Sequence, residues 1–244
     1  MIADLLFRIF PAACPGCGTV SRSGTPGTLC PECLAKLRFF DPALRCPGCG
    51  AENTGTLSLC PQCLAEKPRP WLAALALFPH TGFGRQLIHK FKFADTPELA
   101  RPFAALAAPL LDELPRPPDL IIPIPLQPIR AIRRSYNQSA LLAELIAHAR
   151  GIPLSTALKR RIAFTHQSAL GRRERHTTLK NAFRIAGHPD LAGKHILLVD
   201  DVMTTGSTLD AAARLLLASG ADSLSILVIA RALCRSPRSL AGNR

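Results

Sequence analysis

The sequence contains few aromatic residues, few acidic residues and no long apolar run. Aromatic side chains make up 5% of the 244 residues, with one tryptophan and one tyrosine. Proteins that hold single-stranded nucleic acid by base stacking present several aromatic side chains, so this composition argues against a base-stacking platform. No apolar stretch approaches the roughly 20 residues that span a membrane. We therefore expect a cytoplasmic protein without membrane insertion.

Acidic residues are scarce enough to leave the chain strongly basic. It carries 30 lysine and arginine residues against 17 aspartate and glutamate residues, a formal charge of +13. Such a balance favours polyanionic partners: phosphates, pyrophosphate or nucleic acid. Residues 159–184 concentrate this charge, with eight basic residues and one acidic residue, Glu174. They show no sustained apolar period, so we expect a long mobile loop or a loose hairpin with a functional role.

Cysteine is plentiful by contrast, and eight of the nine cysteines form four Cys-x-x-Cys pairs. In a reducing compartment such pairs are more often zinc ligands than disulfides. The pairs belong to an internal repeat, because residues 14–18 recur as 46–50 and residues 29–35 recur, with one change, as 59–65. Each copy supplies four thiolates, enough for one tetrahedral structural Zn²⁺. The predicted ligands are Cys14, Cys17, Cys30 and Cys33 for the first ion and Cys46, Cys49, Cys60 and Cys63 for the second.

Two alternatives to this arrangement stay open. The ligands could be interleaved, with the first turn joined to the third, or the pairs could be redox dithiols. Four similar pairs are too many for one redox centre, and no thioredoxin-like strand and helix surround them. Few apolar residues lie between the cysteines, so we expect bound metal to stabilise this module. The ninth cysteine, Cys234, is expected to be a small buried apolar residue.

The most informative stretch is a strand, a polar loop and a helix in direct succession. Four apolar residues, Ile196–Val199, predict a short buried strand. Two carboxylates follow, Asp200 and Asp201, which we expect to face solvent at the strand end. An Ala/Leu-rich helix is predicted at 209–219. The loop between carboxylates and helix is rich in hydroxyl groups and contains Thr204, Thr205, Gly206, Ser207 and Thr208.

This order of elements suits a phosphorylated sugar. A helix N-terminus offers unpaired N–H groups and a partial positive charge, which bind phosphate. Gly206 lets the backbone approach the anion, and the loop hydroxyls add donors. The carboxylates would repel phosphate, but they suit the vicinal hydroxyls of a ribose or a hydrated Mg²⁺. The stretch therefore predicts a site for ribose 5'-phosphate; the alternative is a plain surface turn with a helix cap.

Residues 199–208, Val-Asp-Asp-Val-Met-Thr-Thr-Gly-Ser-Thr, resemble the 5-phosphoribosyl-1-pyrophosphate (PRPP) motif of the type I phosphoribosyltransferases. In that family the acidic pair holds the ribose hydroxyls and the following loop holds the 5'-phosphate. Together with the double cysteine repeat, the motif resembles the ComF/GntX family, implicated in competence and DNA uptake, over nearly the whole chain. Further marks of that family are Pro123-Ile-Pro125, residues 133–138, Gln167 with Leu170 and Arg175, and residues 181–183; Ser135 and Tyr136 depart from its usual Gly-Phe.

The expected fold is α/β, because predicted strands alternate with helices, and parallel sheets of this kind bind ligands at the carboxyl ends of their strands. The resemblance implies a parallel sheet of type I phosphoribosyltransferase type with a small N-terminal double zinc-ribbon module. We place the double zinc ribbon at 1–66 and the phosphoribosyltransferase-like domain at 71–244. Strands are expected at 71–78, 120–125, 196–199 and 224–230, and helices at 85–93, 97–114, 137–150 and 209–219.

The resemblance leaves an enzyme and a binding protein as the main possibilities. An enzyme would bind Mg²⁺-PRPP and pass the phosphoribosyl group to an unknown acceptor, releasing pyrophosphate, by positioning and charge stabilisation. A binding protein would hold PRPP or single-stranded DNA without turnover, acting with other DNA-uptake proteins; a scaffold with a decayed site is the third possibility, which the intact loop argues against. Arg130, Arg133 and Arg134 are candidates for the pyrophosphate pocket, and Arg172 and Arg175 for a loop that closes over the site beside the catalytic pair Asp200 and Asp201.

Overall fold

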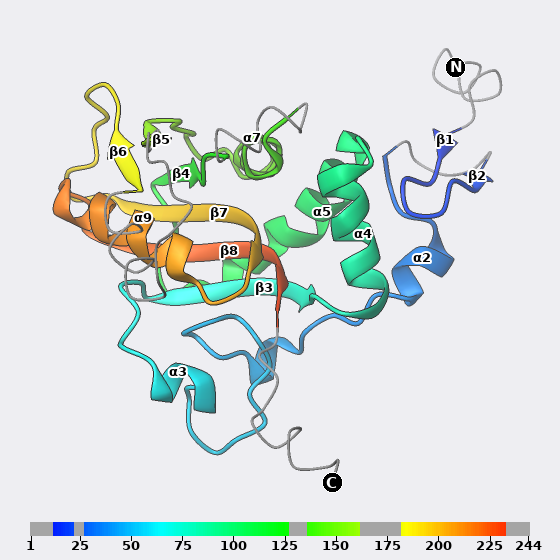
Figure 1. Ribbon diagram of the computed structural model, residues 1–244, viewed down its shortest axis with the longest axis horizontal. Helices are drawn as coiled ribbons and strands as arrows, with labels where there is room; N and C mark the ends of the chain where they lie inside the picture. The colour runs from blue at the N-terminus through cyan, green and yellow to red at the C-terminus, as the bar shows by residue number, and fades with distance from the viewer. Residues whose placement is uncertain (1–11, 22–26, 127–135, 162–181, 233–244) are drawn as a thin grey trace, which may run out of the picture.

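The computed structural model describes residues 12–21, 27–126, 136–161 and 182–232, and it is built around a four-stranded parallel sheet (Figure 1). The strands lie in the order β3-β8-β7-β4, and each neighbouring pair is parallel. The expectation of a parallel α/β sheet is confirmed. The strands are β3 (Ala73–Pro79), β4 (Leu120–Pro123), β7 (His195–Met203) and β8 (Ser223–Arg231).

The central strand β7 is longer than expected. The sequence predicts a strand at 196–199, yet β7 continues through the two aspartates to Met203. Strand β8 pairs with it along this whole length, from His195 opposite Ser223 to Met203 opposite Arg231. Pairing with a neighbour thus overrides the low strand propensity of aspartate. As a result, the acidic pair belongs to the strand and not to the loop after it.

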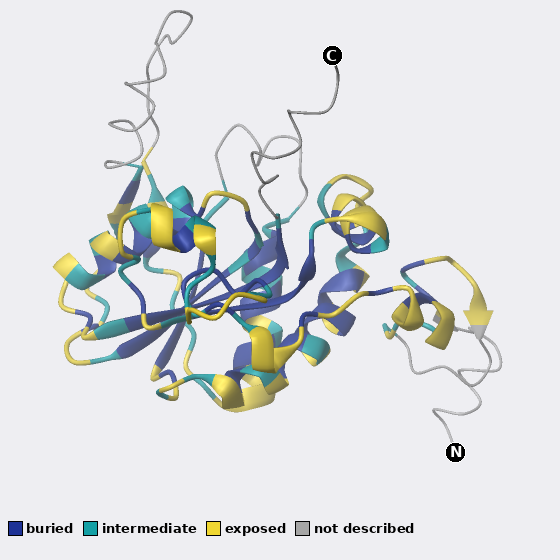
Figure 2. Ribbon diagram, turned by 90° about the horizontal axis from the view of Figure 1, so that it is seen from below, coloured by how far each residue is buried: buried dark blue, intermediate teal, exposed yellow. Residues whose placement is uncertain are grey.

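Both faces of the sheet are covered by helices. Because successive side chains of a strand point to opposite faces, Leu197 and Val199 pack in the core with α4, α5 and α7, while Ile196 and Leu198 pack on the α9 side. Figure 2 shows buried residues gathered along the strands and exposed residues on the outer sides of the helices. The helices are α4 (Gly82–Phe93), α5 (Ala100–Ala107), α7 (Gln138–Arg150) and α9 (Ser207–Ala218).

The helix expected at 97–114 is divided into three pieces. A 3₁₀ turn, η2 (Pro97–Leu99), leads into α5, and η3 (Ala108–Glu113) follows it. Pro102 lies in the first turn of α5, where its missing N–H costs little, whereas Pro109 cannot continue the α-helical hydrogen bonds. In the part of the chain that the structure describes, no helix is both long and apolar enough to cross a membrane.

The two ends of the basic segment pair with each other as the strands of a hairpin. Strand β5 (Leu158–Arg160) pairs antiparallel with β6 (Phe183–Ile185). A hairpin is one of the two forms that the sequence predicts here. Residues 162–181, which lie between the two strands and include Arg172 and Arg175, are outside the described residues.

The two halves of the cysteine-rich region have different surroundings (Figure 1). We call the half around Cys14–Cys33 the first ribbon and the half around Cys46–Cys63 the second ribbon. The second ribbon lies against the sheet, where the carbonyl of Pro47 accepts the N–H of Ala74 at 2.8 Å. The indole Nε1 of Trp71 donates to the carbonyl of Gly48 at 3.1 Å. The first ribbon lies beside α4 instead. Its elements and those of the second ribbon are β1 (Ala12–Ala13), β2 (Val20–Ser21), α2 (Pro31–Ala35), η1 (Pro42–Leu44) and α3 (Pro61–Ala65).

Apolar residues of the cysteine-rich region join it to the sheet. Leu37 is buried in the core on one face and Phe40 in the core on the other. The cysteines of the second ribbon belong to the same cluster as Phe40. The division into a ribbon module at 1–66 and a second domain at 71–244 stays a prediction, and it separates residues that share a core.

The repeat offers a test of this packing, because Gly18 and Gly50 occupy equivalent positions with φ of +78° and +73°. A Cβ at Gly50 would lie 2.8 Å from the backbone nitrogen of Ala76, whereas a Cβ at Gly18 would meet nothing within 4 Å. Both alanine variants carry the strain of a left-handed backbone, but only Gly50→Ala is overpacked. We expect Gly50→Ala to lower the free energy of unfolding by about 1–3 kcal/mol more than Gly18→Ala.

Urea unfolding followed by the fluorescence of the single tryptophan, Trp71, measures this difference, since that side chain is buried against the second ribbon. Equal losses in the two variants would show that the second ribbon does not depend on its contact with β3.

Candidate functional site

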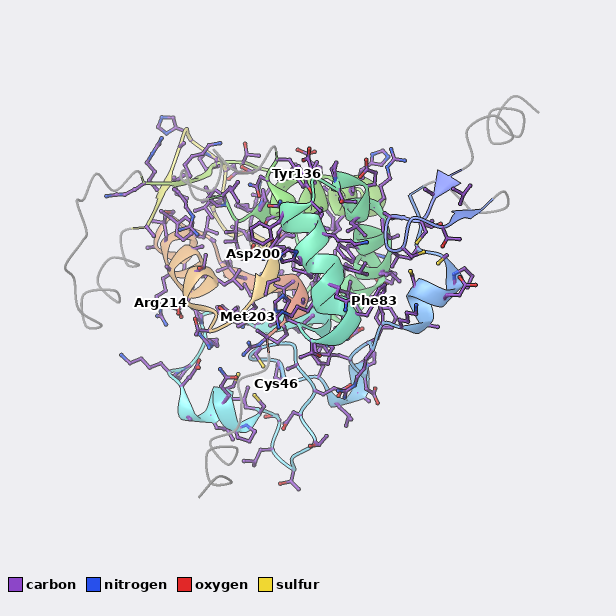
Figure 3. All side chains as sticks on the ribbon, turned by 45° about the vertical axis from the view of Figure 1, so that its right-hand side comes forward. Cys46, Phe83, Tyr136, Asp200, Met203 and Arg214 are labelled. Carbon is purple, nitrogen blue, oxygen red and sulfur yellow. The ribbon has the colours of Figure 1, made fainter. Side chains whose placement is uncertain are left out.

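A pocket of about 290 Å³ lies at the carboxyl ends of β4 and β7. Parallel α/β sheets commonly bind ligands at this edge. The pocket is lined by α4, the start of α7, β5, the end of β7 and the start of α9, which are far apart in the sequence. Figure 3 labels Asp200, which lines the pocket, and Tyr136, which precedes α7. Its charged and hydroxyl-bearing residues include Lys92, Ser139, Arg160, Asp200, Asp201 and Thr208.

The two adjacent carboxylates are held by two different helices. Ser139, at the start of α7, donates its hydroxyl to Asp200 at 2.8 Å. The Nζ of Lys92, near the end of α4, lies 2.8 Å from a carboxylate oxygen of Asp201. Asp201 is only 7% exposed and Asp200 is half-buried. The expectation that both face open solvent is wrong, because packed helices and the end of β7 enclose them.

Burial raises the pKa of Asp200 to about 7, and the neighbouring carboxylate of Asp201 adds to the rise. Hydrogen bonds from the hydroxyl of Ser139 and from the N–H of Asp201 oppose this effect by favouring the charged form. Near neutral pH Asp200 therefore exists in both forms. It can accept a hydrogen bond as a carboxylate or donate one as an acid.

Lys92 and Ser139 are two of the site residues that sequence reasoning missed. By default the lysines of this helix are expected to be solvated, yet the Lys92 side chain is 18% exposed and paired. Lys90 stays exposed, although it donates to the carbonyl of Gly16 at 2.6 Å. The only sequence signal is that the two lysines flank Phe91, a core residue. No local pattern marks Ser139, which follows the cap of a helix.

The hydroxyl-rich loop leads from the end of β7 into α9. Gly206 is the N-cap of α9 and has φ of +79°, in the left-handed region. This conformation favours glycine, and a Cβ there would also lie 2.6 Å from the Cε of Met203, whose side chain would have to shift. The hydroxyls of Thr205 and Ser207 lie 2.7 Å apart, and Thr208 lines the pocket. A helix N-terminus thus opens on the same pocket as the acidic pair.

The start of α7 ties that helix to the end of α4. The hydroxyl of Tyr136 donates to the carbonyl of Phe91 at 2.6 Å, and Gln138 donates to the same carbonyl at 3.2 Å. Asn137 caps α7 by accepting from the N–H of Ser139 at 3.1 Å. Tyr136 is a departure from the motif that the sequence resembles. Its hydroxyl makes a contact that a phenylalanine cannot make.

An arginine that the sequence did not single out lies at the site. Arg160 of β5 lines the pocket, donates to the carbonyl of Pro125 at 3.1 Å and stacks over Phe183 with 4.8 Å to the ring centroid. The arginines that the sequence predicts at the site lie outside the described residues: Arg130, Arg133, Arg134, Arg172 and Arg175.

The eight paired cysteines form two clusters, each built from one copy of the repeat. Within each cluster the ligand atoms all lie within 4.8 Å of one another. This arrangement supports the sequential pairing over the interleaved one. The clusters are Cys14, Cys17, Cys30 and Cys33, and Cys46, Cys49, Cys60 and Cys63.

The geometry of both clusters fits zinc. The sulfurs of Cys17 and Cys30 lie 3.7 Å apart, as do those of Cys49 and Cys60. A disulfide bond is about 2.05 Å long, whereas four sulfurs about 2.3 Å from a tetrahedral Zn²⁺ are roughly 3.8 Å apart. The backbone N–H of Cys30 and that of Cys60 each donate to a cluster sulfur at 3.3 Å, which favours the thiolate.

Comparison with known proteins gives the same two parts. Residues 93–242 match the phosphoribosyl transferase domain, and residues 5–64 match the double zinc ribbon domain. The first match covers more than half of the chain. Both matches agree with the sheet and the cysteine clusters described above.

Similar proteins have names that refer to DNA. The chain is 37% identical over 229 residues to the DNA utilization protein YhgH of Escherichia coli O6:H1, covering 89% of this chain and 90% of that protein. It is 30% identical over 211 residues to Competence protein F of Haemophilus influenzae, covering 84% and 90%. A solved glutamine PRPP amidotransferase from B. subtilis covers 58% of this chain and 30% of its own, with 17% identity and a TM-score of 0.42, too distant to bear on the site.

The raised pKa of Asp200 predicts how stability depends on pH. Its pKa is about 7 in the folded protein and about 3.9 when unfolded. Between these values the folded state holds a proton that the unfolded state has released, so the free energy of unfolding falls as pH rises through this window. Asn at position 200 stays neutral. The stability advantage of Asp200→Asn over the wild type should therefore grow by roughly 2–3 kcal/mol from pH 5 to pH 8.

Denaturant unfolding at both pH values measures this effect. Asp222→Asn is the matched control, because that exposed carboxylate pairs with Arg116 at the opposite edge of the sheet. An advantage of Asp200→Asn that stays constant with pH would contradict the assigned pKa.

Proposed function

Since this chain belongs to the phosphoribosyl transferase domain family, and to one family with the DNA utilization protein YhgH, we propose that it binds PRPP in the pocket at the carboxyl edge of its sheet. The observation that carries the proposal is the meeting of the acidic pair and a helix N-terminus at one pocket. Carboxylates accept hydrogen bonds from vicinal hydroxyls, and a helix start binds phosphate. Ribose 5-phosphate carries both groups.

The proposal gives each part of PRPP its own set of groups. Asp200 and Asp201 take the ribose hydroxyls, and loop residues 204–208 take the 5'-phosphate. Lys92 and Arg160 bring positive charge to the pocket and suit the pyrophosphate. The arginines proposed from the sequence for the pyrophosphate and for closure over the site are Arg133, Arg134, Arg172 and Arg175.

Mg²⁺ is the proposed companion of the pyrophosphate. It prefers oxygen ligands and keeps several of its waters, so it needs only one or two carboxylates from the protein. The acidic pair supplies such oxygens. When Mg²⁺-PRPP binds, Lys92 would leave Asp201 and pair with the phosphates. Asp200 would lose the proton that its burial favours.

The proposed reaction is transfer of the phosphoribosyl group to an acceptor whose identity is open. The bond between the ribose anomeric carbon and the pyrophosphate oxygen breaks, and the electron pair leaves with pyrophosphate. Positive charge develops on the ribose ring, where the acidic pair stabilises it, while cations stabilise the leaving group. A cytoplasmic location belongs to the same proposal. A reducing compartment is consistent with the eight described cysteines, because none of them forms a disulfide.

Removal of the acidic pair tests the binding site. Asp200→Asn combined with Asp201→Asn should weaken binding of Mg²⁺-PRPP by at least about a hundredfold. Each carboxylate supplies charge-assisted hydrogen bonds of about 1.5–3 kcal/mol, and both are lost. Isothermal titration calorimetry on the full chain measures the affinity.

The structure offers a control with the same loss of charge. Asp119 and Asp222 both pair with Arg116 at the amino-terminal edge of the sheet and are about half exposed. The double variant Asp119→Asn/Asp222→Asn should keep the wild-type affinity. Equal affinity in both double variants would remove the acidic pair from the site.

Binding of single-stranded DNA is a second candidate function. The net charge of +13 favours it, and so do the names of the similar proteins. The low aromatic content leaves electrostatic contacts with the phosphates as the main source of affinity. A terminal 5'-phosphate of DNA would also suit the loop at the start of α9.

This function predicts a steep salt dependence. The affinity for a thymidine oligonucleotide should fall more than about tenfold between 50 and 200 mM salt, with little change when the base sequence is changed. Fluorescence anisotropy with oligonucleotides that end in a 5'-phosphate or a 5'-hydroxyl measures both properties. An affinity that does not change with salt would contradict DNA binding through the phosphates. If PRPP displaces the oligonucleotide with a 5'-phosphate but not the one with a 5'-hydroxyl, the DNA end binds in the pocket.

A further inference from the structure

Arg231, the last residue of β8, is one of the largest fully buried side chains in the described part of the chain, with 1% exposure. Its guanidinium donates to the carbonyl of Met203 at 3.2 Å and to the carbonyl of Thr204. It also donates to the side-chain oxygen of Gln62 at 3.1 Å. Burying a cation is costly unless its donors find acceptors. Here the acceptors are the backbone at the start of the phosphate loop, the carbonyl of Ala232 and one amide, while Nε finds no acceptor among the described residues.

Gln62 belongs to the second zinc ribbon, between the last two cysteines of that cluster. Its Nε2 donates to Glu66 at 3.2 Å. Glu66 forms an ion pair with Arg69, and Arg69 donates to the carbonyl of Thr205 at 2.9 Å. These contacts form one continuous network. It begins at the carbonyl of Thr204, runs through Arg231, Gln62, Glu66 and Arg69, and ends at the carbonyl of Thr205.

Arg69 is held in place on several sides. Its guanidinium lies over the ring of Trp71, 5.4 Å from the centroid, and its side chain is 11% exposed. A Cβ at Gly206 would lie 3.2 Å from its Nη1, so the guanidinium packs directly against the loop. In Figure 3 the labelled Met203 lies between the labelled Asp200, which lines the pocket, and the labelled Cys46 of the second cluster.

Peptide geometry explains what these contacts do. In a trans peptide the C=O and the N–H point in opposite directions. Because the carbonyls of Thr204 and Thr205 are held towards the ribbon, the N–H groups of Thr205 and Gly206 point away from it. These N–H groups stand at the entrance of α9, where an anion would bind.

We propose that the second zinc ribbon orients the 5'-phosphate loop from behind. Gln62, Glu66, Arg69 and Arg231 are then positioning residues, and none of them lines the pocket. The inference rests on the proposed binding of a 5'-phosphate. Charge also favours it, because four thiolates around a bound Zn²⁺ carry a net charge of −2, which stabilises the buried Arg231 and the partly buried Arg69 near this ribbon.

The repeat supplies a matched control. Glu32 holds the position in the first ribbon that Gln62 holds in the second, two residues after the third cysteine of each cluster. The first ribbon reaches α4 through the contact between Lys90 and Gly16. Glu32 is exposed and lies at the N-terminus of α2.

The experiment compares Gln62→Ala and Glu32→Ala in the full chain, with zinc content measured in each. Calorimetry is run with ribose 5-phosphate, which carries the 5'-phosphate, and with Mg²⁺-pyrophosphate, which does not. Gln62→Ala should weaken ribose 5-phosphate binding roughly tenfold and leave pyrophosphate binding unchanged. Glu32→Ala should change neither. If Gln62→Ala loses zinc, Arg69→Ala decides instead, because it lies outside the cysteine turns and should give the same result.

The outcomes separate this inference from the proposed function. If the wild type does not bind ribose 5-phosphate, the proposed function is wrong. If the wild type binds it and the Gln62→Ala variant binds it equally well, the support of the loop by the ribbon is wrong. Equal weakening of both ligands would indicate general loss of structure and would also overturn the positioning role.

Discussion

The pairing of β7 with β8 is the contact on which the rest of the molecule depends. It continues to the last residue of each strand, Met203 opposite Arg231. The two aspartates are therefore part of a hydrogen-bonded central strand, where local opening is costly. The same register puts the buried guanidinium of Arg231 beside the first carbonyls of the loop. The acidic pair, the loop and the second ribbon thus take their relative positions from one strand pair.

Adjacent carboxylates at the end of a buried strand are electrostatically unfavourable, since each disfavours the charged form of the other. The fold reduces this cost with one cation and one hydroxyl, Lys92 and Ser139, brought from two helices on the same face. The compensation is incomplete, because the pKa of Asp200 remains raised to about 7. Such residual instability is typical of functional sites. A divalent cation, or hydroxyls that can donate to both carboxylates, would supply the missing stabilisation.

The features that could be predicted from the sequence are those that depend on neighbours in the chain. The buried residues of β7, the glycine that begins α9 and the two sets of four cysteines all follow from local patterns. Lys92 and Ser139 could not be predicted, because the packing of α4 and α7 against the sheet decides where their side chains point. The continuation of β7 through two aspartates likewise depends on β8. The contact of Gln62 with Arg231 joins residues 169 positions apart in the chain, and only the fold brings them together.

The two zinc ribbons are similar in sequence, yet they contact different elements that border the pocket. The first reaches α4, where Lys90 donates to the carbonyl of Gly16, and that helix also carries Lys92 to the acidic pair. The second reaches the loop at the start of α9 through its contacts with the buried Arg231 and the partly buried Arg69. A helix and a loop on separate faces of a sheet have few direct contacts with which to fix their spacing. The ribbons follow one another along the chain, and each is held by its own cluster of sulfurs. They can therefore stabilise the position of α4 and that of the loop before α9 from outside the sheet.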